Sequence, residues 1–163
     1  MKKPFRILMV CMGNICRSPT AHGVMQSLLQ REGLQGRVVV DSCGTHDFHI
    51  GEAPDTRAQQ HAQQRGYDLS ALRARQVEAT DFENADLILP MDMQNMTRLR
   101  LQCPPAHQHK LHLLTEFGQK LHAKAVPDPY YGGDSGFDEV LDLIEDACEG
   151  LLKTLPSEMR QKD

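Results

Sequence analysis

The sequence of 163 residues contains no tryptophan, few aromatic residues and no long apolar run. No window approaches the ~18 to 20 continuous apolar residues that a membrane-spanning helix needs, and the first apolar run is too short for the core of a signal peptide. A net charge of −4 provides neither the positive excess typical of nucleic-acid binding nor a polybasic membrane anchor. We therefore expect a protein that binds neither nucleic acid nor membrane.

Cysteine is also scarce: the five cysteines are an odd number at irregular spacing, which does not fit a disulfide framework. A reducing compartment suits such a set, so the sequence favours a cytoplasmic location. His107, His109 and His112, with Cys103 nearby, could suggest zinc, but their spacing matches no standard structural zinc site. The sequence therefore predicts no metal and no cofactor.

One stretch organises the rest of the chain: residues 10–19, VCMGNICRSP. It closes the short apolar run 5–10, which predicts a buried strand. Ser18 followed by Pro19 is a helix-start signal, with Ser18 as N-cap and Pro19 at the first helical position. Such a loop points backbone N–H groups and the positive end of the helix dipole into one hollow. The stretch therefore predicts an anion site, with phosphate as the obvious ligand.

Two side chains of this loop suit phosphate chemistry. The thiolate of Cys11, which is the nucleophilic form, would be stabilised by the loop N–H groups, the Ser18 hydroxyl and Arg17. Arg17 adds a planar fork that binds two phosphate oxygens at once. Gly13 permits the tight turn, and Asn14 tolerates a left-handed backbone while its side chain ties the loop internally. The pattern predicts a nucleophile followed by a phosphate clamp.

These residues resemble the signature of the low-molecular-weight protein tyrosine phosphatases: Cys, five residues, Arg, Ser, with GNICRSP spelled as here. The resemblance extends through Asp41-Ser42, Ile50-Gly51 and residues 128–132 (DPYYG). It implies one phosphatase domain over residues 1–163, which hydrolyses phosphotyrosine in proteins through a cysteinyl-phosphate on Cys11 and releases inorganic phosphate. The implied phosphate-binding residues are Met12, Gly13, Asn14, Ile15, Cys16, Arg17 and Ser18, and Asn14, Ser18 and Ser42 would hold the loop in place.

Asp128 is the candidate proton donor. It lies between Pro127 and Pro129, which hold its backbone stiffly, although spacing alone favours a simple turn for this segment. The resemblance makes Asp128 the general acid and base of the family's acid loop. It also makes Phe48, Tyr130 and Tyr131 the walls of the substrate crevice.

The roles of three further residues, Cys16, Leu72 and Cys43, are less directly indicated by the sequence. Oxidation could join Cys16 to Cys11 in a protective disulfide, or Cys16 could merely pack. Leu72 stands where many family members carry a histidine hydrogen-bonded towards the loop asparagine, so loop rigidity or nucleophile tuning could differ. Cys43 stands where the family usually has alanine, and we interpret it as a small buried apolar residue.

The remaining patterns alternate strand and helix. Strands are expected at 5–10, 37–42, 86–89 and 111–114, and helices at 19–32, 55–65, 93–101 and from a capping box at 135–138 to about 155. Segment 67–80 is expected to be a loop or short helix that places Arg73 and Arg75 on a solvated face. The alternation predicts an α/β fold, doubly wound, with four parallel strands flanked by helices. The family strand order would be 2-1-3-4, with the phosphate-binding loop after strand one.

Other functions are possible on this fold. Arsenate reductases carry a further cysteine pair after the third helix region, and positions 76–102 contain none. Arginine phosphatases typically have threonine in place of Ile15, so the isoleucine favours tyrosine. A silent phosphate-binding module is disfavoured because Cys11, Arg17 and Asp128 are all present. The resemblance implies phosphotyrosine-containing protein partners, which would include bacterial tyrosine autokinases, and a monomer or weak dimer.

Overall fold

The computed structural model describes residues 3–130 and 134–162, and its centre is a parallel sheet. The strands are β1 (Phe5–Cys11), β2 (Val38–Gly44) and β3 (Leu87–Pro90), in the order β2-β1-β3. The register aligns Cys11 with Gly44 and Val10 with Pro90. The carboxyl ends of all three strands therefore lie side by side, and the loop after β1 begins between the ends of β2 and β3.

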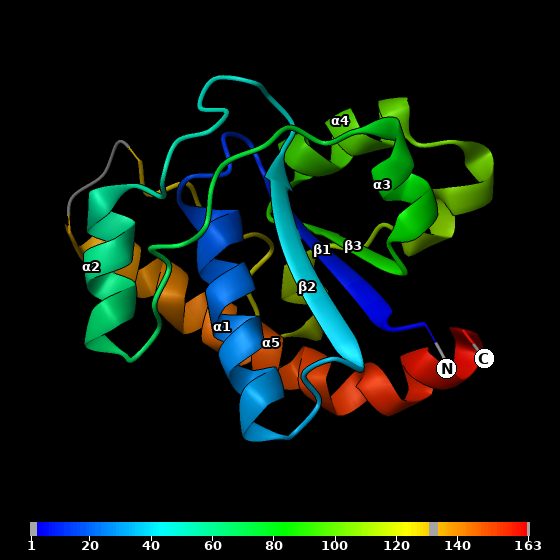
Figure 1. Ribbon diagram of the computed structural model, residues 1–163. Coiled ribbons are helices and arrows are strands. Elements are labelled where there is room, and N and C mark those ends of the chain that lie inside the picture. The colour runs from blue at the N-terminus through cyan, green and yellow to red at the C-terminus, as the bar shows by residue number, and fades with distance from the viewer. Residues whose placement is uncertain (1–2, 131–133, 163) are drawn as a thin grey trace.

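Helices cover both faces of this sheet, as expected for a doubly wound fold (Figure 1). On one face lie α1 (Arg17–Arg31) and α5 (Asp134–Lys162), with α2 (Thr56–Gln64) beside them. On the other face lie α3 (Ala79–Asn84) and α4 (Met93–Gln102). Two short 3₁₀ helices, η1 (Pro105–Lys110) and η2 (Leu114–Phe117), follow α4. Among the described helices, none is long and apolar enough to cross a membrane.

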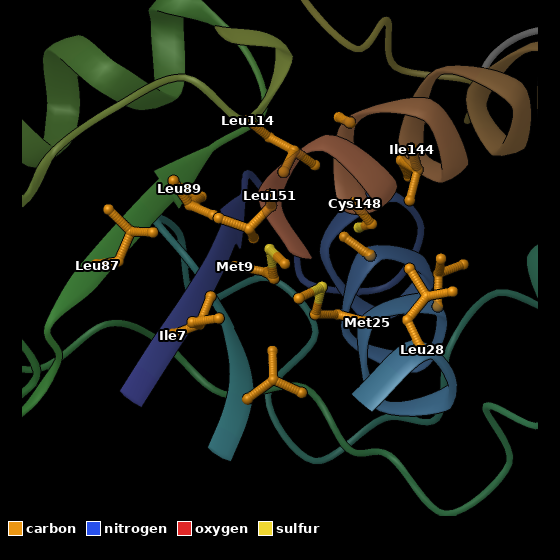
Figure 2. Close-up of a cluster of buried hydrophobic side chains, with 14 of the residues drawn as sticks. Ile7, Met9, Met25, Leu28, Leu87, Leu89, Leu114, Ile144, Cys148 and Leu151 are labelled. Atoms are coloured by element: carbon orange, nitrogen blue, oxygen red, sulfur yellow. The ribbon is translucent and has the colours of Figure 1, made fainter. Parts of the chain in front are cut away.

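The alternation of side chains along β1 builds two separate cores. Ile7 and Met9 point towards α1 and α5, where Met25 and Leu151 pack with them (Figure 2). Leu8 and Val10 lie on the opposite face and belong to the cluster that contains residues of α3 and α4. Each such buried side chain contributes roughly 1.5 to 3 kcal/mol relative to exposure. Burial on both faces therefore fixes β1, and with it the start of the following loop.

The prediction of a fourth strand at 111–114 is wrong for the described part of the chain. Only Leu111 reaches the sheet, through an isolated bridge to Ile88, and the backbone N–H of His112 donates to the Ile88 carbonyl at 3.1 Å. Leu114 begins η2 and is fully buried in the core on the α5 face. The chain must leave the sheet edge to bury Leu114 there, so no second ladder pair forms.

Several helix boundaries also differ from the sequence prediction. Helix α1 begins at Arg17, so neither Ser18 nor Pro19 starts it. Helix α5 begins at Asp134, before the expected capping box, and continues through Pro156 to Lys162. The extension beyond residue 155 is explained by Met159, which packs against the core on the α1 side. Because Cys16 and not Ser18 is the N-cap of α1, the Ser18 hydroxyl remains available for other hydrogen bonds.

Candidate active site

The loop after β1 has the backbone of an anion cradle. Residues 12–16 connect β1 to α1, and Asn14 adopts a left-handed conformation with a φ of 58°, as the sequence predicted. Within the described residues, the backbone N–H groups of Met12 to Cys16 donate to no acceptor. Unpaired N–H groups beside a helix N-terminus bind anions well. The local geometry therefore suits a phosphate group.

Hydrogen bonds from the Asn14 side chain brace this loop. Its Nδ2 donates to the Ser18 Oγ at 2.8 Å, and its Oδ1 accepts the backbone N–H of Arg75 at 3.0 Å. Leu72 occupies the position at which the resemblance would place a histidine. It is half-buried, and its backbone N–H donates to the Leu69 carbonyl. Both ends of the Asn14 amide therefore have partners without a histidine at position 72.

Arg73 is exposed, as expected, whereas the Arg75 side chain is only 33% exposed and is paired with two carboxylates. Its guanidinium donates to Asp81 at 2.9 Å and to Asp41 at 2.8 Å. The hydrogen bonds from Arg75 to these carboxylates outweigh burial and raise its pKa, so it stays charged. Arg75 thus fixes the segment whose backbone N–H holds Asn14.

The end of β2 supports the loop from behind. The backbone N–H of Thr45 donates to the Cys11 carbonyl at 2.9 Å, and that of His46 donates to the Met12 carbonyl at 3.0 Å. A Cβ at Gly44 would lie 2.6 Å from the Met12 carbonyl oxygen, which is closer than real contacts allow. Glycine at position 44 is therefore required for this close approach of the two backbones.

The Cys11 thiol is buried beside the Ser18 hydroxyl, with 3.0 Å between Sγ and Oγ. The same Oγ accepts from Asn14 and lies 3.3 Å from the Cys43 carbonyl, to which it can donate. A thiolate carries no proton, so when Cys11 is ionised the Ser18 hydroxyl must donate to Sγ. The N-cap position of α1 is occupied by Cys16 and not by Ser18, so the Ser18 hydroxyl is not needed to cap the helix and can make this contact.

Arg17 is almost completely buried, at 2% exposure, and is held by two distant segments. Its Nη1 donates to Asp92 Oδ2 at 2.6 Å and to the Val126 carbonyl at 3.1 Å, and its Nη2 lies 3.7 Å from Asp128 Oδ2. Burial alone would lower the pKa of Arg17, but the Cys11 thiolate and the Asp92 carboxylate outweigh it and raise that pKa. The guanidinium therefore remains a charged clamp that is fixed before any ligand arrives.

The loop of residues 126–130, called the acid loop here after the role that the resemblance implies for Asp128, brings Asp128 to the same place. One carboxylate oxygen of Asp128 accepts the backbone N–H of Tyr130 at 3.0 Å, and its side chain is 33% exposed. Arg57 donates to the Tyr130 carbonyl at 2.9 Å, and its guanidinium lies 5.7 Å from the Tyr130 ring centroid. Arg17 and Arg57 therefore anchor the acid loop from two sides.

These elements enclose a pocket of about 100 Å³. It is lined by Cys11, Met12, Gly13, Ile15, Cys16, Arg17, Phe48, His49, Asp128 and Tyr130. Phe48 is 64% exposed and Tyr130 is 37% exposed, so both stand at the mouth. Tyr131, the third expected wall residue, lies outside the described residues. The predicted nucleophile, clamp and proton donor thus line one pocket.

Three residues around this pocket were not predicted from the sequence as site residues. His49 lines it, with Nδ1 hydrogen-bonded to Glu52 at 2.7 Å, and a Cβ on Gly13 would lie 2.9 Å from the His49 ring. Asp92 is the N-cap of α4, and it also holds Arg17. No sequence pattern indicated a role for Arg57, because its contact with the acid loop joins residues that are far apart in the sequence.

Ser42 is buried, and its hydroxyl is hydrogen-bonded to Nδ1 of His22 in α1 at 3.0 Å. This bond ties β2 to α1 and not to the loop itself. His22 is only 6% exposed, and burial lowers its pKa; nearby Asp41 raises that pKa and Arg75 lowers it. His22 is therefore neutral in the folded protein near neutral pH.

The lowered pKa of His22 predicts a loss of stability in mild acid. As pH falls below about 6.5, the unfolded chain binds a proton that the folded chain refuses, so the free energy of unfolding decreases by up to about 1.4 kcal/mol per pH unit. The loss continues until pH reaches the lowered pKa of the folded state. Urea unfolding at pH 7.5 and 5.5 should show a smaller decrease for His22→Gln than for the wild type. The exposed His122→Gln is the control, and an unchanged pH dependence in His22→Gln would contradict this account.

Cys16 and Cys43 are both buried free thiols. Cys43 is fully buried in the cluster on the α3–α4 face, as its interpretation as a small apolar residue requires. Burial, followed by the nearby Asp55 carboxylate, raises the pKa of Cys16. Cys16 therefore keeps its proton and is a poor nucleophile in this conformation.

Two of the residues considered for zinc, His112 and Cys103, have other hydrogen-bond partners. His112 is hydrogen-bonded through Nδ1 to Glu116 at 3.1 Å and through Nε2 to the carbonyl of His109, and Cys103 Sγ donates to the carbonyl of Pro104. Across residues 3–130 and 134–162, no group of three or more His, Cys, Asp or Glu side chains is placed to hold a metal ion.

Comparison with known proteins extends the likeness beyond the pocket. The model of the family described as low molecular weight phosphotyrosine protein phosphatase matches residues 6–161. A Synechocystis protein whose name places it among the low molecular weight protein-tyrosine-phosphatases is 43% identical over 94% of this chain and 98% of its own. A crystal structure of a protein tyrosine phosphatase from Entamoeba histolytica, with Hepes in the active site, has a TM-score of 0.92 at 39% identity and covers 94% of this chain and 97% of that one.

The crystal structure of a Drosophila arginine phosphatase is also similar, with a TM-score of 0.84 at 31% identity over 91% of this chain and 96% of that one. Both structural likenesses span nearly the whole of each chain. They concern the entire fold and not only the loop after β1.

Proposed function

Because this chain belongs to the low molecular weight phosphotyrosine protein phosphatase family and is therefore a hydrolase, we propose that it removes phosphate from phosphotyrosine in proteins by using Cys11, Arg17 and Asp128. One observation carries the assignment of these residues: the Cys11 thiol, the Arg17 guanidinium and the Asp128 carboxylate line the same pocket of about 100 Å³. The family supplies the reaction, and the pocket supports this division of roles.

In the first step, the Cys11 thiolate attacks phosphorus and forms an S–P bond while the bond from phosphorus to the phenolic oxygen breaks. Asp128 gives its proton to that oxygen, so tyrosine leaves as a neutral phenol. Arg17 and the unpaired N–H groups of residues 12–16 stabilise the charge on the equatorial oxygens. Because Arg17 is already fixed by Asp92 and Val126, this stabilisation requires little reorganisation.

In the second step, water attacks the cysteinyl-phosphate and gives a proton to the ionised Asp128. The S–P bond breaks, inorganic phosphate leaves and the thiolate returns. The Ser18 hydroxyl, 3.0 Å from Sγ, donates to the departing thiolate and makes it a better leaving group. Asp128 is then protonated again and ready for the next substrate.

The pocket mouth supports a preference for aromatic phosphate esters. Phe48 and Tyr130 stand exposed at the rim, above Cys11 at the floor. A phenyl ring between them would gain offset or edge-to-face contacts worth about 0.5 to 1.5 kcal/mol beyond burial. A phosphoserine side chain is too short to gain them while its phosphate reaches the loop.

The test compares phosphotyrosine, phosphoserine and phosphoarginine substrates in reductant and chelator. We expect phosphotyrosine to be hydrolysed at least about tenfold more efficiently in kcat/KM than the other two. Phosphoarginine belongs in the set because the Drosophila arginine phosphatase has the same fold. Ile15→Thr is the matched variant: a shift towards phosphoarginine would identify Ile15 as a selectivity residue. Faster turnover of phosphoarginine by the wild type would overturn the tyrosine assignment.

Several finer points belong to the same proposal. We include bacterial tyrosine autokinases among the substrates, a monomer or weak dimer as the solution state, one domain over residues 1–163 and the cytoplasm as the compartment. Cys16 remains a candidate redox partner. Hydrogen peroxide would oxidise the Cys11 thiolate to a sulfenic acid and be reduced to water. The Cys16 thiol would then lose its proton and attack the Cys11 sulfur, so that an S–S bond forms as the sulfenic oxygen leaves as a second water. The diagnostic product is a Cys11–Cys16 disulfide instead of a sulfinic acid at Cys11, read by mass spectrometry.

A further inference from the structure

A second and larger hollow adjoins the mouth of the catalytic pocket. Its volume is about 500 Å³, and it is lined by Met12, His46, Met93, Gln94, Thr97 and Arg98. Met12 lines both hollows. The His46 ring stacks on Phe48, with 5.0 Å between ring centroids and 28° between planes, and Phe48 belongs to the catalytic rim. The two hollows are therefore neighbours across Met12 and across this ring pair.

One face of α4 forms the far wall of the second hollow. Met93, Gln94, Thr97 and Arg98 fall at helical positions i, i+1, i+4 and i+5, which share one side of a helix. All four are exposed, and Met93 is 48% exposed although it is large and apolar. This face thus combines an uncovered apolar side chain with a cation.

The charge on this face has no counterpart in the described part of the chain. Arg98 makes no ion pair there. Asp92, which precedes Met93 at the N-terminus of α4, already accepts from Arg17 at 2.6 Å and from the backbone N–H of Asn95 at 2.8 Å. Since Asp92 fixes both the N-terminus of α4 and the phosphate clamp, the α4 face is held in a set position relative to the catalytic pocket.

We propose that this hollow binds the substrate polypeptide beside its phosphotyrosine and favours an acidic residue, which pairs with Arg98. The inference rests on the proposed function, because a protein substrate must run its backbone across the surface next to the pocket. An apolar residue of the same segment covers Met93. The carboxylate preference is local, since the chain as a whole carries a net charge of −4 and gives no general attraction for acidic peptides.

The test measures kcat/KM for phosphotyrosine peptides that are neutral, acidic on the N-terminal side or acidic on the C-terminal side. We expect the wild type to prefer one acidic peptide over the neutral one, mainly through a lower KM. Arg98→Ala should reduce this preference about twofold to fivefold, and Arg98→Glu should reduce it about tenfold through like-charge repulsion. The preference should also decrease at high salt. p-Nitrophenyl phosphate has no peptide flank, so its kcat and KM should not change.

Arg100→Ala is the matched control, because Arg100 is an exposed arginine of the same helix that does not line the hollow. An equal loss of preference in Arg98→Ala and Arg100→Ala would overturn the proposal in favour of a general field effect. Equal turnover of acidic and neutral peptides by the wild type would also overturn it while leaving the proposed function intact. Failure to hydrolyse any phosphotyrosine peptide would instead overturn the proposed function, and the inference with it.

Discussion

Replacing Cys11 by serine is expected to lower kcat for a phosphotyrosine peptide by about 10⁴-fold or more. A serine hydroxyl at this position does not ionise near neutral pH, so the loop N–H groups and Arg17 would hold a phosphate that nothing attacks. The change is nearly isosteric, and serine retains a contact with the Ser18 hydroxyl, which lies 3.0 Å from the present Sγ. The expected defect is therefore in chemistry and not in folding.

Steady-state kinetics with the purified variant measure this loss, and thermal unfolding checks the fold. Cys103→Ser is the control, since Cys103 lies outside the pocket and its Sγ donates only to the Pro104 carbonyl, an interaction that a hydroxyl can keep. Residual activity of Cys11→Ser within tenfold of the wild type would show that Cys11 is not the nucleophile. An equal loss of activity in Cys103→Ser would show that the effect is not specific to the Cys11 thiol.

Replacing Asp128 by asparagine is expected to lower kcat for phosphotyrosine by about 10²- to 10⁴-fold, the usual contribution of general acid–base catalysis. An asparagine oxygen can still accept the backbone N–H of Tyr130, which now bonds to Asp128 at 3.0 Å, so the acid loop should keep its shape. The loss should be smaller for p-nitrophenyl phosphate, because its leaving group is a weaker base and needs less help from a proton donor.

The comparison of these two substrates distinguishes proton donation from loop distortion. Asp47→Asn is the matched control, since Asp47 is an exposed carboxylate one residue before Phe48 that does not line the pocket. An equal loss on both substrates would indicate that the variant displaces the loop. A loss below about tenfold on phosphotyrosine would assign proton donation to another group.

Local patterns predicted much of the secondary structure. The apolar run at 5–10 and the helical patterns at 55–65 and 93–101 depend on residues that are neighbours in sequence, and the structure has β1, α2 and α4 at these places within one or two residues. Periodicity and capping act over one or two turns, so the sequence reports them directly. Strand pairing does not act locally, and the expected strand at 111–114 was wrong because Leu114 is buried on the α5 face instead.

By itself, the sequence determined the loop chemistry: a strand, a cysteine, a left-handed asparagine and an arginine before a helix, all within the range over which a single turn sets geometry. Only the tertiary structure decided how that loop is held. The Arg17–Asp92 and Asn14–Arg75 contacts join residues that are 75 and 61 positions apart. The hydrogen bond of Ser42 to His22 and the approach of Asp128 to the pocket also depend on how the layers pack. Such contacts form because burial on both faces of β1 fixes the sheet and helices against one another, and no local pattern encodes those distances.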